Sequence, residues 1–242
     1  MTGSGLPPPS PDWAWFLDID GTLIDIAPTP SAIHVPPGLV DLLARLSRRC
    51  GGALALVSGR SVDNILDLMA PLRLPAAGLH GLERFCSDGR IERPPPLDGL
   101  DGVRRALTMF ATGHPGVVLE DKRLTLALHY RAVPQLEEAC RQAAQAAAVH
   151  CPGLAVVAGK MVFELRPAGS DKGVAVRRFM AEPPFAGRPP LFAGDDLTDE
   201  DGFAVVNAMG GVSLLVGPPR ATAAFWRVES VEVFRQWLAA GA

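Results

Sequence analysis

Short apolar runs alternate along this 242-residue chain with segments in which apolar residues recur at helical spacing. Predominantly apolar runs of strand length occur at 13–17, 53–57, 76–79, 190–193 and 212–216. Apolar residues three and four positions apart indicate amphipathic helices near 39–49, 62–69, 174–179 and 231–238, and one more helix that ends near 209. This alternation of strands and helices predicts a parallel sheet that helices cover on both faces.

The pattern changes in the middle of the chain. Helical spacing appears near 98–111 and 133–149, and apolar strand patterns appear at 117–119, 124–130, 154–157 and 162–165. Pairs of strands joined by short turns favour an antiparallel sheet with helices on one side. The run Arg93-Pro94-Pro95-Pro96 predicts a stiff boundary, and Pro167-Ala168-Gly169 predicts a hinge back to the first pattern. Just before this boundary, Asp88-Gly89 predicts a hairpin turn.

Together these patterns predict an α/β fold with an inserted domain. The core is a doubly wound, Rossmann-like parallel sheet formed by 13–95 and 167–242, and 96–166 forms an α+β cap. The first twelve residues, rich in Pro, Gly and Ser, are expected to be a flexible tail.

Composition and charge exclude several classes of protein. The formal net charge of −3 and the pI near 6.0 give no basic surface, so nucleic acid is not expected as a partner. No apolar run approaches the roughly 18 to 20 residues that a membrane span needs. The four cysteines show neither the spacing of a zinc site nor the density of a disulfide scaffold, which favours a reducing cytoplasm. A monomer is the default expectation.

Two carboxylates follow the first predicted strand, two residues apart, in Asp18-Ile19-Asp20-Gly21. Side chains two apart in an extended chain share a face, so Asp18 and Asp20 can point into the same space beyond the strand. Two carboxylates so close repel each other unless a bound cation, a shared proton or a basic neighbour relieves the repulsion. The pair therefore indicates a metal, a lysine, or both.

Further polar residues follow predicted strands or open predicted helices: Ser58, Lys172, Asp195, Asp196 and Asp199. In an open parallel sheet, ligands bind beyond the carboxyl ends of the strands, so these side chains are expected to meet the first two aspartates. Each one alone has an ordinary interpretation as a turn residue, a helix cap or a solvated loop. Their occurrence together favours one site. The chain has no Gly-x-x-x-x-Gly-Lys-[Ser/Thr] loop, which argues against a P-loop nucleotide hydrolase.

The order Asp-x-Asp-Gly-Thr, Ser-Gly-Arg, Lys and Gly-Asp-Asp-x-x-x-Asp resembles the haloacid dehalogenase superfamily of phosphotransferases. The resemblance implies that Asp18 attacks phosphorus and forms an aspartyl-phosphate, and that Asp20 acts first as general acid and then as general base. Ser58 and Lys172 would hold the phosphoryl oxygens. The same motifs supply two candidate substrate-binding residues, Gly21 and Arg60.

The resemblance also implies Mg²⁺ as the cofactor. The candidate ligands are Asp18, Asp20 through its carbonyl oxygen, Asp195, and Asp196 or Asp199 as an outer ligand or orienting group. Phosphoryl transfer depends on positioning and on neutralisation of charge, and a hard cation among carboxylates provides both.

Five segments carry a closer resemblance, to trehalose-6-phosphate phosphatases, within a similarity that extends from about 13 to 217. They are GLHGLER at 78–84, EDK at 120–122, LHYR at 128–131, GKMVFELRP at 159–167 and GDDLTDE at 194–200. The resemblance implies hydrolysis of trehalose 6-phosphate to trehalose and phosphate. Where family members often have Ala-Glu after His-Gly, this chain has Leu82-Glu83, and it has Ser-Asp-Lys-Gly at the lysine motif. These departures concern fine specificity and leave the reacting groups in place.

In that family the Glu-x-Lys and Gly-Lys-x-x-x-Glu elements of the cap bind the sugar distal to the phosphate. These elements point to Glu120, Lys122, Lys160 and Glu164. Arg131, in the run His129-Tyr130-Arg131, is a further cap candidate, while His80 and Gly81 are expected at the core–cap interface. On one strand, Lys160 and Glu164 would share a face about 13 Å apart. Ordinary surface ion pairs on an exposed sheet are the alternative explanation for these charges.

Three other functions remain open at this point. The first is a phosphatase of the same fold that acts on another sugar phosphate, such as sucrose phosphate or a phosphohexose. The second is a catalytically silent protein that senses a sugar phosphate. The third, a response-regulator receiver domain, also clusters aspartates and a lysine at strand ends, but it has about half this length and no cap.

Overall fold

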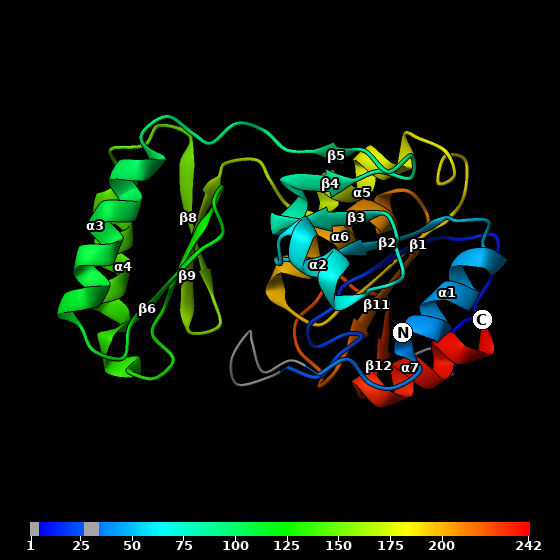
Figure 1. Ribbon diagram of the computed structural model, residues 1–242. Helices are drawn as coiled ribbons and strands as arrows, with labels where there is room; N and C mark the ends of the chain where they lie inside the picture. Colours follow the sequence, from blue (N-terminus) through cyan, green and yellow to red (C-terminus); the bar gives the residue numbers. More distant parts are fainter. Residues whose placement is uncertain (1–4, 27–33) are drawn as a thin grey trace. The chain divides into compact units, whose positions relative to one another are not determined.

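The computed structural model describes residues 5–26 and 34–242, so the first four residues of the predicted tail lie outside it. The described chain divides into two compact units (Figure 1). One unit, called the core, contains the described residues up to Arg93 together with Asp171–Ala242, and the other, called the cap, contains Pro94–Ser170. Within the described part of the tail, the backbone carbonyl of Pro7 accepts a hydrogen bond from Trp237 Nε1 at 3.1 Å.

The core is built on an eight-stranded sheet with the order β12-β11-β10-β1-β2-β3-β4-β5. Its strands are β1 (Ala14–Leu17), β2 (Leu54–Val57), β3 (Ala76–Gly78), β4 (Glu83–Phe85), β5 (Ile91–Glu92), β10 (Pro190–Gly194), β11 (Val212–Val216) and β12 (Trp226–Val228). The strands from β12 to β3 are parallel, which confirms the predicted α/β fold, and β4 and β5 add an antiparallel edge.

Five helices pack on this sheet. They are α1 (Leu39–Arg49), α2 (Val62–Leu68), α5 (Lys172–Met180), α6 (Glu200–Ala208) and α7 (Val231–Ala240). Helix α1 packs beside α7, and α5 packs beside α6, as Figure 1 shows. Helix α1 buries Leu39, Leu42, Leu43 and Leu46, the stripe expected from the helical spacing of its leucines.

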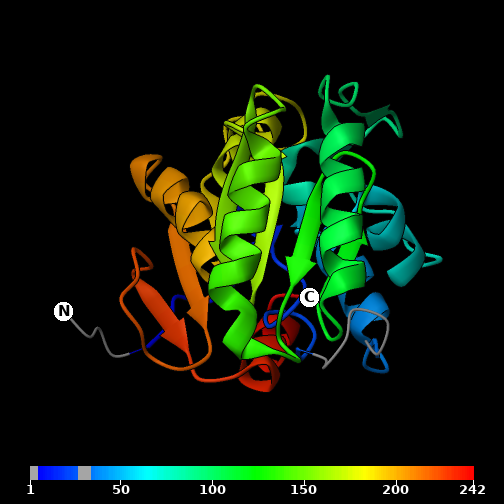
Figure 2. The same ribbon diagram turned by 90° about the vertical axis from the view of Figure 1, so that its left-hand side faces the viewer.

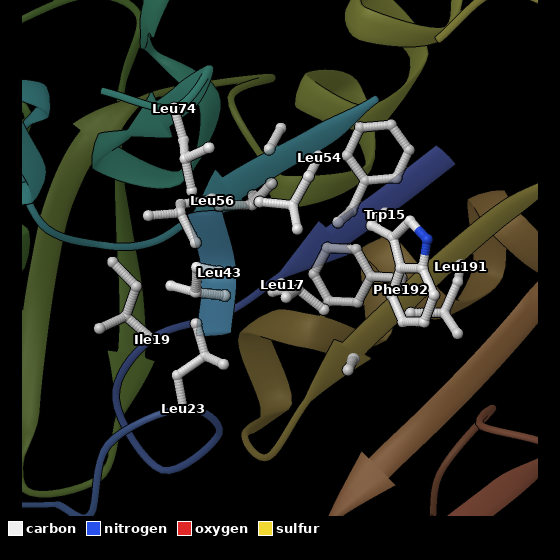
Figure 3. Close-up of a cluster of buried hydrophobic side chains, with 14 of the residues drawn as sticks. Trp15, Leu17, Ile19, Leu23, Leu43, Leu54, Leu56, Leu74, Leu191 and Phe192 are labelled. Carbon is white, nitrogen blue, oxygen red and sulfur yellow. The ribbon is translucent and has the colours of Figure 1, made fainter. Parts of the chain in front are cut away.

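Strand β1 is fully buried in the centre of the sheet, and Figure 3 shows its side chains Trp15 and Leu17 among those of β2 and β10. Trp15 pairs with Leu54 on one side and with Leu191 on the other. Burial on both faces explains why β1 is a continuous apolar run without polar alternation. Because β1 and β10 are parallel and in register, the residues that follow their carboxyl ends emerge side by side.

Three short strands were not predicted from the sequence: β4, β5 and β12. They contain only two or three residues each, and β4 buries the charged Glu83 and Arg84. Arg84 donates hydrogen bonds to Glu92 and Glu182 and lies over the ring of Phe179. Ion pairs and a cation–π contact therefore replace the apolar run by which a strand is recognised. The turn predicted at Asp88-Gly89 is confirmed, because it connects β4 to β5.

The cap contains a four-stranded antiparallel sheet and two helices that lie side by side in Figures 1 and 2. The strand order is β6-β7-β9-β8. The elements are α3 (Leu100–Gly113), β6 (Val118–Asp121), β7 (Leu126–His129), α4 (Glu137–Ala148), β8 (Leu154–Gly159) and β9 (Val162–Pro167). Leu128, Phe163 and Leu165 form the core of this unit with Leu107 of α3 and Cys140 of α4.

The prediction that Lys160 and Glu164 share one strand was wrong. Strand β8 ends at Gly159, β9 begins at Val162, and these two residues pair. Lys160 therefore lies in the hairpin turn with Met161, whose φ of 63° is left-handed. Glu164 lies within β9.

Among the described residues, no helix is long and apolar enough to cross a membrane. All four cysteines are buried free thiols.

Candidate active site

Three carboxylates meet where β1 and β10 end. Asp18 follows β1 directly, and its backbone N–H donates to the carbonyl of Ala193 in β10 at 3.0 Å. One oxygen each of Asp18, Asp195 and Asp199 lies within 4.8 Å of the others. The register of the two strands thus brings together residues that are about 180 positions apart in the chain, as the sequence predicted for the carboxyl edge of a parallel sheet.

Lys172 joins two of these carboxylates. It is the first residue of α5, whose N-cap Asp171 accepts a hydrogen bond from the N–H of Val174 at 2.7 Å. The ammonium Nζ lies 2.8 Å from Asp18 Oδ1 and 2.7 Å from Asp199 Oδ1, and all three side chains are at most 5% exposed. Burial alone would lower the pKa of Lys172, but the charges of Asp18 and Asp199 outweigh it and raise that pKa. Lys172 is therefore a permanent cation in the centre of the site.

The cluster still holds an excess of negative charge. Burial raises the pKa of Asp18 well above its usual range, with Lys172 acting against this shift and Asp199 and Asp195 adding to it. Burial, followed by the charge of Asp199, raises the pKa of Asp195 to about 7. Three carboxylates thus share one lysine, and a divalent cation would balance them.

Backbone hydrogen bonds fix the loop that carries Asp195. The fully buried Asp199 accepts through Oδ2 from the N–H of Asp195 at 3.0 Å and from the N–H of Asp196 at 2.9 Å. Gly21 lies against the Asp195 side chain, because a Cβ at Gly21 would come within 2.2 Å of Asp195 Oδ2. The φ of +84° at Gly21 also favours glycine. This predicted residue therefore leaves room for the carboxylate.

Asp20 is held away from the three-carboxylate cluster by a bidentate ion pair with Arg60. The guanidinium lies 2.7 Å from Asp20 Oδ2 through Nε and 2.8 Å from Oδ1 through Nη2. Arg60 Nη1 donates to Asn64 Oδ1 of α2 at 2.7 Å, which fixes the guanidinium from its other side. Two sequence candidates with different expected roles, Asp20 and Arg60, are thus direct partners.

The loop after β2 places Ser58 at the same edge. Ser58 is 1% exposed, and its hydroxyl oxygen accepts from the backbone N–H of Arg60 at 3.2 Å. The carbonyl of Ser58 accepts from the N–H of His80 at 3.0 Å, so the loops after β2 and β3 are joined. Gly81 packs on α5, since a Cβ there would meet the carbonyl oxygen of Asp171 at 2.7 Å.

A second polar cluster lies within the cap, on the face of its sheet opposite the helices. Lys122 Nζ lies 3.7 Å from Glu120 Oε2 and 4.0 Å from Glu164 Oε1, and His129 Nε2 lies 3.0 Å from Glu120 Oε2. Burial would raise the pKa of Glu120, but the hydrogen bond with His129 and the charge of Lys122 lower it overall. Glu120 is therefore an ionised acceptor at neutral pH. Arg131 and Lys160 are exposed and do not belong to these ion pairs.

Several contacts of the two clusters were not foreseen from the sequence. Thr22 Oγ1 donates to Asp18 Oδ2 at 3.3 Å, His129 joins Glu120, and Arg220 donates to the backbone carbonyls of Asp195 and Asp196. Arg220 could have been found from the sequence, because it follows strand β11 and the run Gly-Pro-Pro and so stands near the carboxyl end of a parallel strand. The side chains of Asp20 and Asp196, both metal candidates, are outside the three-carboxylate cluster.

The donor atoms of the core cluster suit a hard divalent cation. All are carboxylate oxygens, which Mg²⁺ prefers, and neither a cysteine nor a histidine belongs to the group. Three carboxylates share the single cation Lys172, so the site carries more negative charge than this lysine neutralises. The residues present therefore fit such an ion.

A parallel α/β core that is interrupted by an α+β unit has the fold of haloacid dehalogenase-like proteins. A phosphatase of the haloalkanoate (HAD) enzyme superfamily from Bacteroides thetaiotaomicron has this fold, with 15% identity, a TM-score of 0.63 and 97% of each chain covered. The trehalose-phosphatase family model matches residues 16–232. The chain belongs to the trehalose-phosphatase family.

Similar proteins agree with this assignment. The trehalose-6-phosphate phosphatase of Escherichia coli (strain K12) is 44% identical over 231 residues, which cover 95% of this chain and 86% of the relative. The structure of the C-terminal domain of trehalose-6-phosphate phosphatase from C. albicans superimposes with a TM-score of 0.80 at 24% identity, over 94% of this chain and 91% of that domain.

Proposed function

We propose that this protein hydrolyses trehalose 6-phosphate to trehalose and phosphate with Mg²⁺ as cofactor. The observation that carries the proposal is the buried Asp18–Lys172–Asp199 arrangement with Asp195 beside it, in a chain of the trehalose-phosphatase family. It combines a carboxylate nucleophile, a fixed cation and ligands for a metal at one sheet edge.

In the first step an oxygen of Asp18 attacks phosphorus, and the bond between phosphorus and the sugar oxygen breaks. Asp20, when protonated, gives its proton to the departing sugar oxygen, so the products are free trehalose and an aspartyl-phosphate at Asp18. Lys172 and Ser58 hold phosphoryl oxygens during transfer.

In the second step Asp20, now a carboxylate, takes a proton from water while the water oxygen attacks phosphorus. The bond between phosphorus and Asp18 breaks, which regenerates the Asp18 carboxylate and releases phosphate. Thr22 donates a hydrogen bond to the regenerated carboxylate and keeps its orientation between turnovers.

The bidentate pair of Asp20 with Arg60 constrains this assignment. While both oxygens of Asp20 accept from the guanidinium, the carboxyl group cannot deliver a proton to a leaving oxygen. This ion pair therefore has to open during the catalytic cycle. Between turnovers, Arg60 holds the Asp20 carboxylate in a fixed position.

Asp18, Asp195 and Asp199 would hold Mg²⁺, with Asp20 contributing its carbonyl oxygen and Asp196 acting as an outer group. When bound, the cation supplies positive charge that polarises the phosphoryl group and lowers the repulsion between it and Asp18.

The cap cluster recognises the distal sugar in this proposal. Ionised Glu120 accepts hydrogen bonds from sugar hydroxyls, Glu164 adds a second acceptor, and Lys122 donates to the hydroxyls. Arg131 and Lys160 add exposed hydrogen-bond donors on the same unit. In the core, His80 and Gly81 are further candidates for substrate binding. The four free thiols agree with a reducing compartment, for which we propose the cytoplasm, and one chain contains every proposed group, so a monomer suffices.

The test is phosphate release from a panel of sugar phosphates in the presence of Mg²⁺. We expect kcat/KM for trehalose 6-phosphate to exceed that for glucose 6-phosphate and sucrose 6-phosphate by at least about 100-fold. A site built to hydrogen-bond a second sugar rejects glucose 6-phosphate, which lacks that sugar, and sucrose 6-phosphate, whose hydroxyls are placed differently. Equal turnover of simple hexose phosphates would exclude the disaccharide as the selected substrate.

Replacing Glu120 by glutamine separates sugar binding from chemistry. We expect Glu120→Gln to raise the KM for trehalose 6-phosphate about tenfold or more, through the loss of charge-assisted hydrogen bonds, and to leave turnover of p-nitrophenyl phosphate unchanged. Glu138→Gln is the matched control, because Glu138 lies on α4 and pairs with Arg141. If both variants behave alike, Glu120 does not contact the sugar.

Stability without a divalent cation is expected to fall as pH rises from about 4 to about 7. In this interval the unfolded chain has already released the Asp195 proton, whereas the folded protein still holds it because its pKa is raised to about 7. Mg²⁺ competes with that proton, so it should stabilise the protein more at pH 8 than at pH 5.5. At about 100 times its Kd we expect Tm to rise by about 5 °C or more at pH 8. Thermal unfolding with EDTA or with Mg²⁺, with KCl at equal ionic strength as the control, measures the difference; an equal rise at both pH values contradicts it.

A further inference from the structure

Arg220 reaches from the segment that joins β11 to β12 into the loop that carries the metal-site carboxylates. Its Nε donates to the carbonyl oxygen of Asp195 at 3.2 Å, and its Nη2 donates to the carbonyl oxygen of Asp196 at 2.8 Å. One planar guanidinium therefore binds two successive peptide groups of this loop.

The guanidinium is itself fixed from the other side. Its Nη1 donates to the carbonyl of Ala221 at 2.9 Å and pairs with Glu200 Oε1, at the start of α6. Glu200 Oε2 accepts from the backbone N–H of Ala223 at 2.7 Å. Arg220 is 24% exposed, and every group it binds belongs to the core. Fork geometry and a second set of partners restrict its motion more than a single surface ion pair does.

These contacts complete the restraint of Asp195. Asp199 accepts from the N–H of Asp195, and Arg220 binds the carbonyl of the same residue, so the peptide groups on both sides of the Asp195 side chain are held. Gly21 allows the Asp195 carboxylate to lie close to the β1 loop. The direction of that carboxylate is consequently set by backbone contacts that include Arg220.

We propose that Arg220 is a positioning residue of the cation site, which fixes the loop 195–196 so that Asp195 faces Asp18 and Asp199. The inference rests on the proposed function only through the cation site. Groups that orient the ligands of a metal typically contribute about 10- to 100-fold to metal affinity or activity. Lysine at this position keeps the charge but is a compact ammonium on a flexible stem, which cannot reproduce the planar fork on two carbonyls and a carboxylate.

The test measures cation affinity directly, by calorimetric titration of the metal-free protein with Mg²⁺, in the wild type and in the Arg220→Ala and Arg220→Lys variants. Arg227→Ala is the matched control, because Arg227 lies in β12 and also donates to a loop carbonyl, that of Gly217, at 2.9 Å. We expect the Kd for Mg²⁺ to rise about 10-fold or more in Arg220→Ala, to a smaller extent in Arg220→Lys, and to stay unchanged in Arg227→Ala. At saturating Mg²⁺ the KM for trehalose 6-phosphate is expected to be unchanged.

A purely structural role gives a different result: the Arg220 variants then have a lower Tm, and the folded protein binds Mg²⁺ with wild-type affinity. That outcome overturns the inference. Where Arg220→Ala does not fold, Arg220→Lys decides in the same way, with weakened binding supporting the inference and wild-type affinity overturning it. A wild-type protein that binds no Mg²⁺ contradicts the proposed cofactor instead, so the two failures are distinguishable.

Discussion

Replacing Asp18 by asparagine is expected to lower kcat by about 10⁴-fold or more, because the amide cannot attack phosphorus and the covalent route is lost. The variant should remain folded. Asparagine has the shape of aspartate, its oxygen can still accept from Lys172 or Thr22, and Lys172 keeps its partner Asp199 at 2.7 Å. The expected loss is therefore one of chemistry.

Steady-state phosphate release with Mg²⁺ measures kcat, and rapid quenching with labelled substrate measures phosphate bound to protein. Wild-type protein should show an acid-stable phosphoprotein within the first turnover, and Asp18→Asn should show none. Asp41→Asn, an exposed aspartate on α1, is the control and should retain wild-type values. If Asp18→Asn keeps its turnover, the nucleophile has to be sought elsewhere, and a phosphoprotein that persists without turnover favours a receiver-like function.

The large elements of the fold could be predicted because buried positions are occupied by apolar residues in a pattern that can be recognised in the sequence. Strand β1 lies between two parallel neighbours and is buried on both faces, so it had to be a continuous apolar run. Helix α1 buries one stripe of leucines and shows it as helical spacing. The order of these elements was then enough to place Asp18 and Asp195 at one edge of the sheet.

What could not be predicted depends on specific pairs of side chains. Arg84 of strand β4 is buried with two acidic partners, Glu92 and Glu182, and Glu182 lies 98 positions away, so no local pattern predicts that arrangement. The bidentate ion pair of Asp20 with Arg60 joins two sequence motifs, and the sequence did not indicate that their side chains are in contact. Lys160 was misplaced because Met161 adopts a left-handed φ of 63°, so that Lys160 and Met161 form the turn between Gly159 and Val162.

Replacing Lys172 by methionine is expected to affect both stability and activity, because it removes the cation that pairs with the two buried carboxylates of Asp18 and Asp199. Breaking a buried ion pair by removing one partner typically costs about 3–5 kcal/mol of the free energy of unfolding. At neutral pH we expect a loss of this size in metal-free protein, measured by urea unfolding. Arg177→Met, an exposed position on the same helix, should change stability by less than about 0.5 kcal/mol.

The pH dependence of the stability of Lys172→Met shows whether the lost charge of the lysine causes the destabilisation. Without Lys172 the carboxylates of the site retain protons to higher pH than in the unfolded chain, so the destabilisation should shrink as pH falls from 8 to 5. A loss caused by poor packing of methionine would not depend on pH.

Removing a second charge in Lys172→Met/Asp199→Asn should restore part of the stability at pH 8, because only one buried carboxylate of the pair is then left uncompensated. It should restore no activity, since the phosphoryl group still lacks the ammonium that holds it. The proposed function thus assigns Lys172 two separable roles, one in stability and one in catalysis, and the double variant distinguishes them.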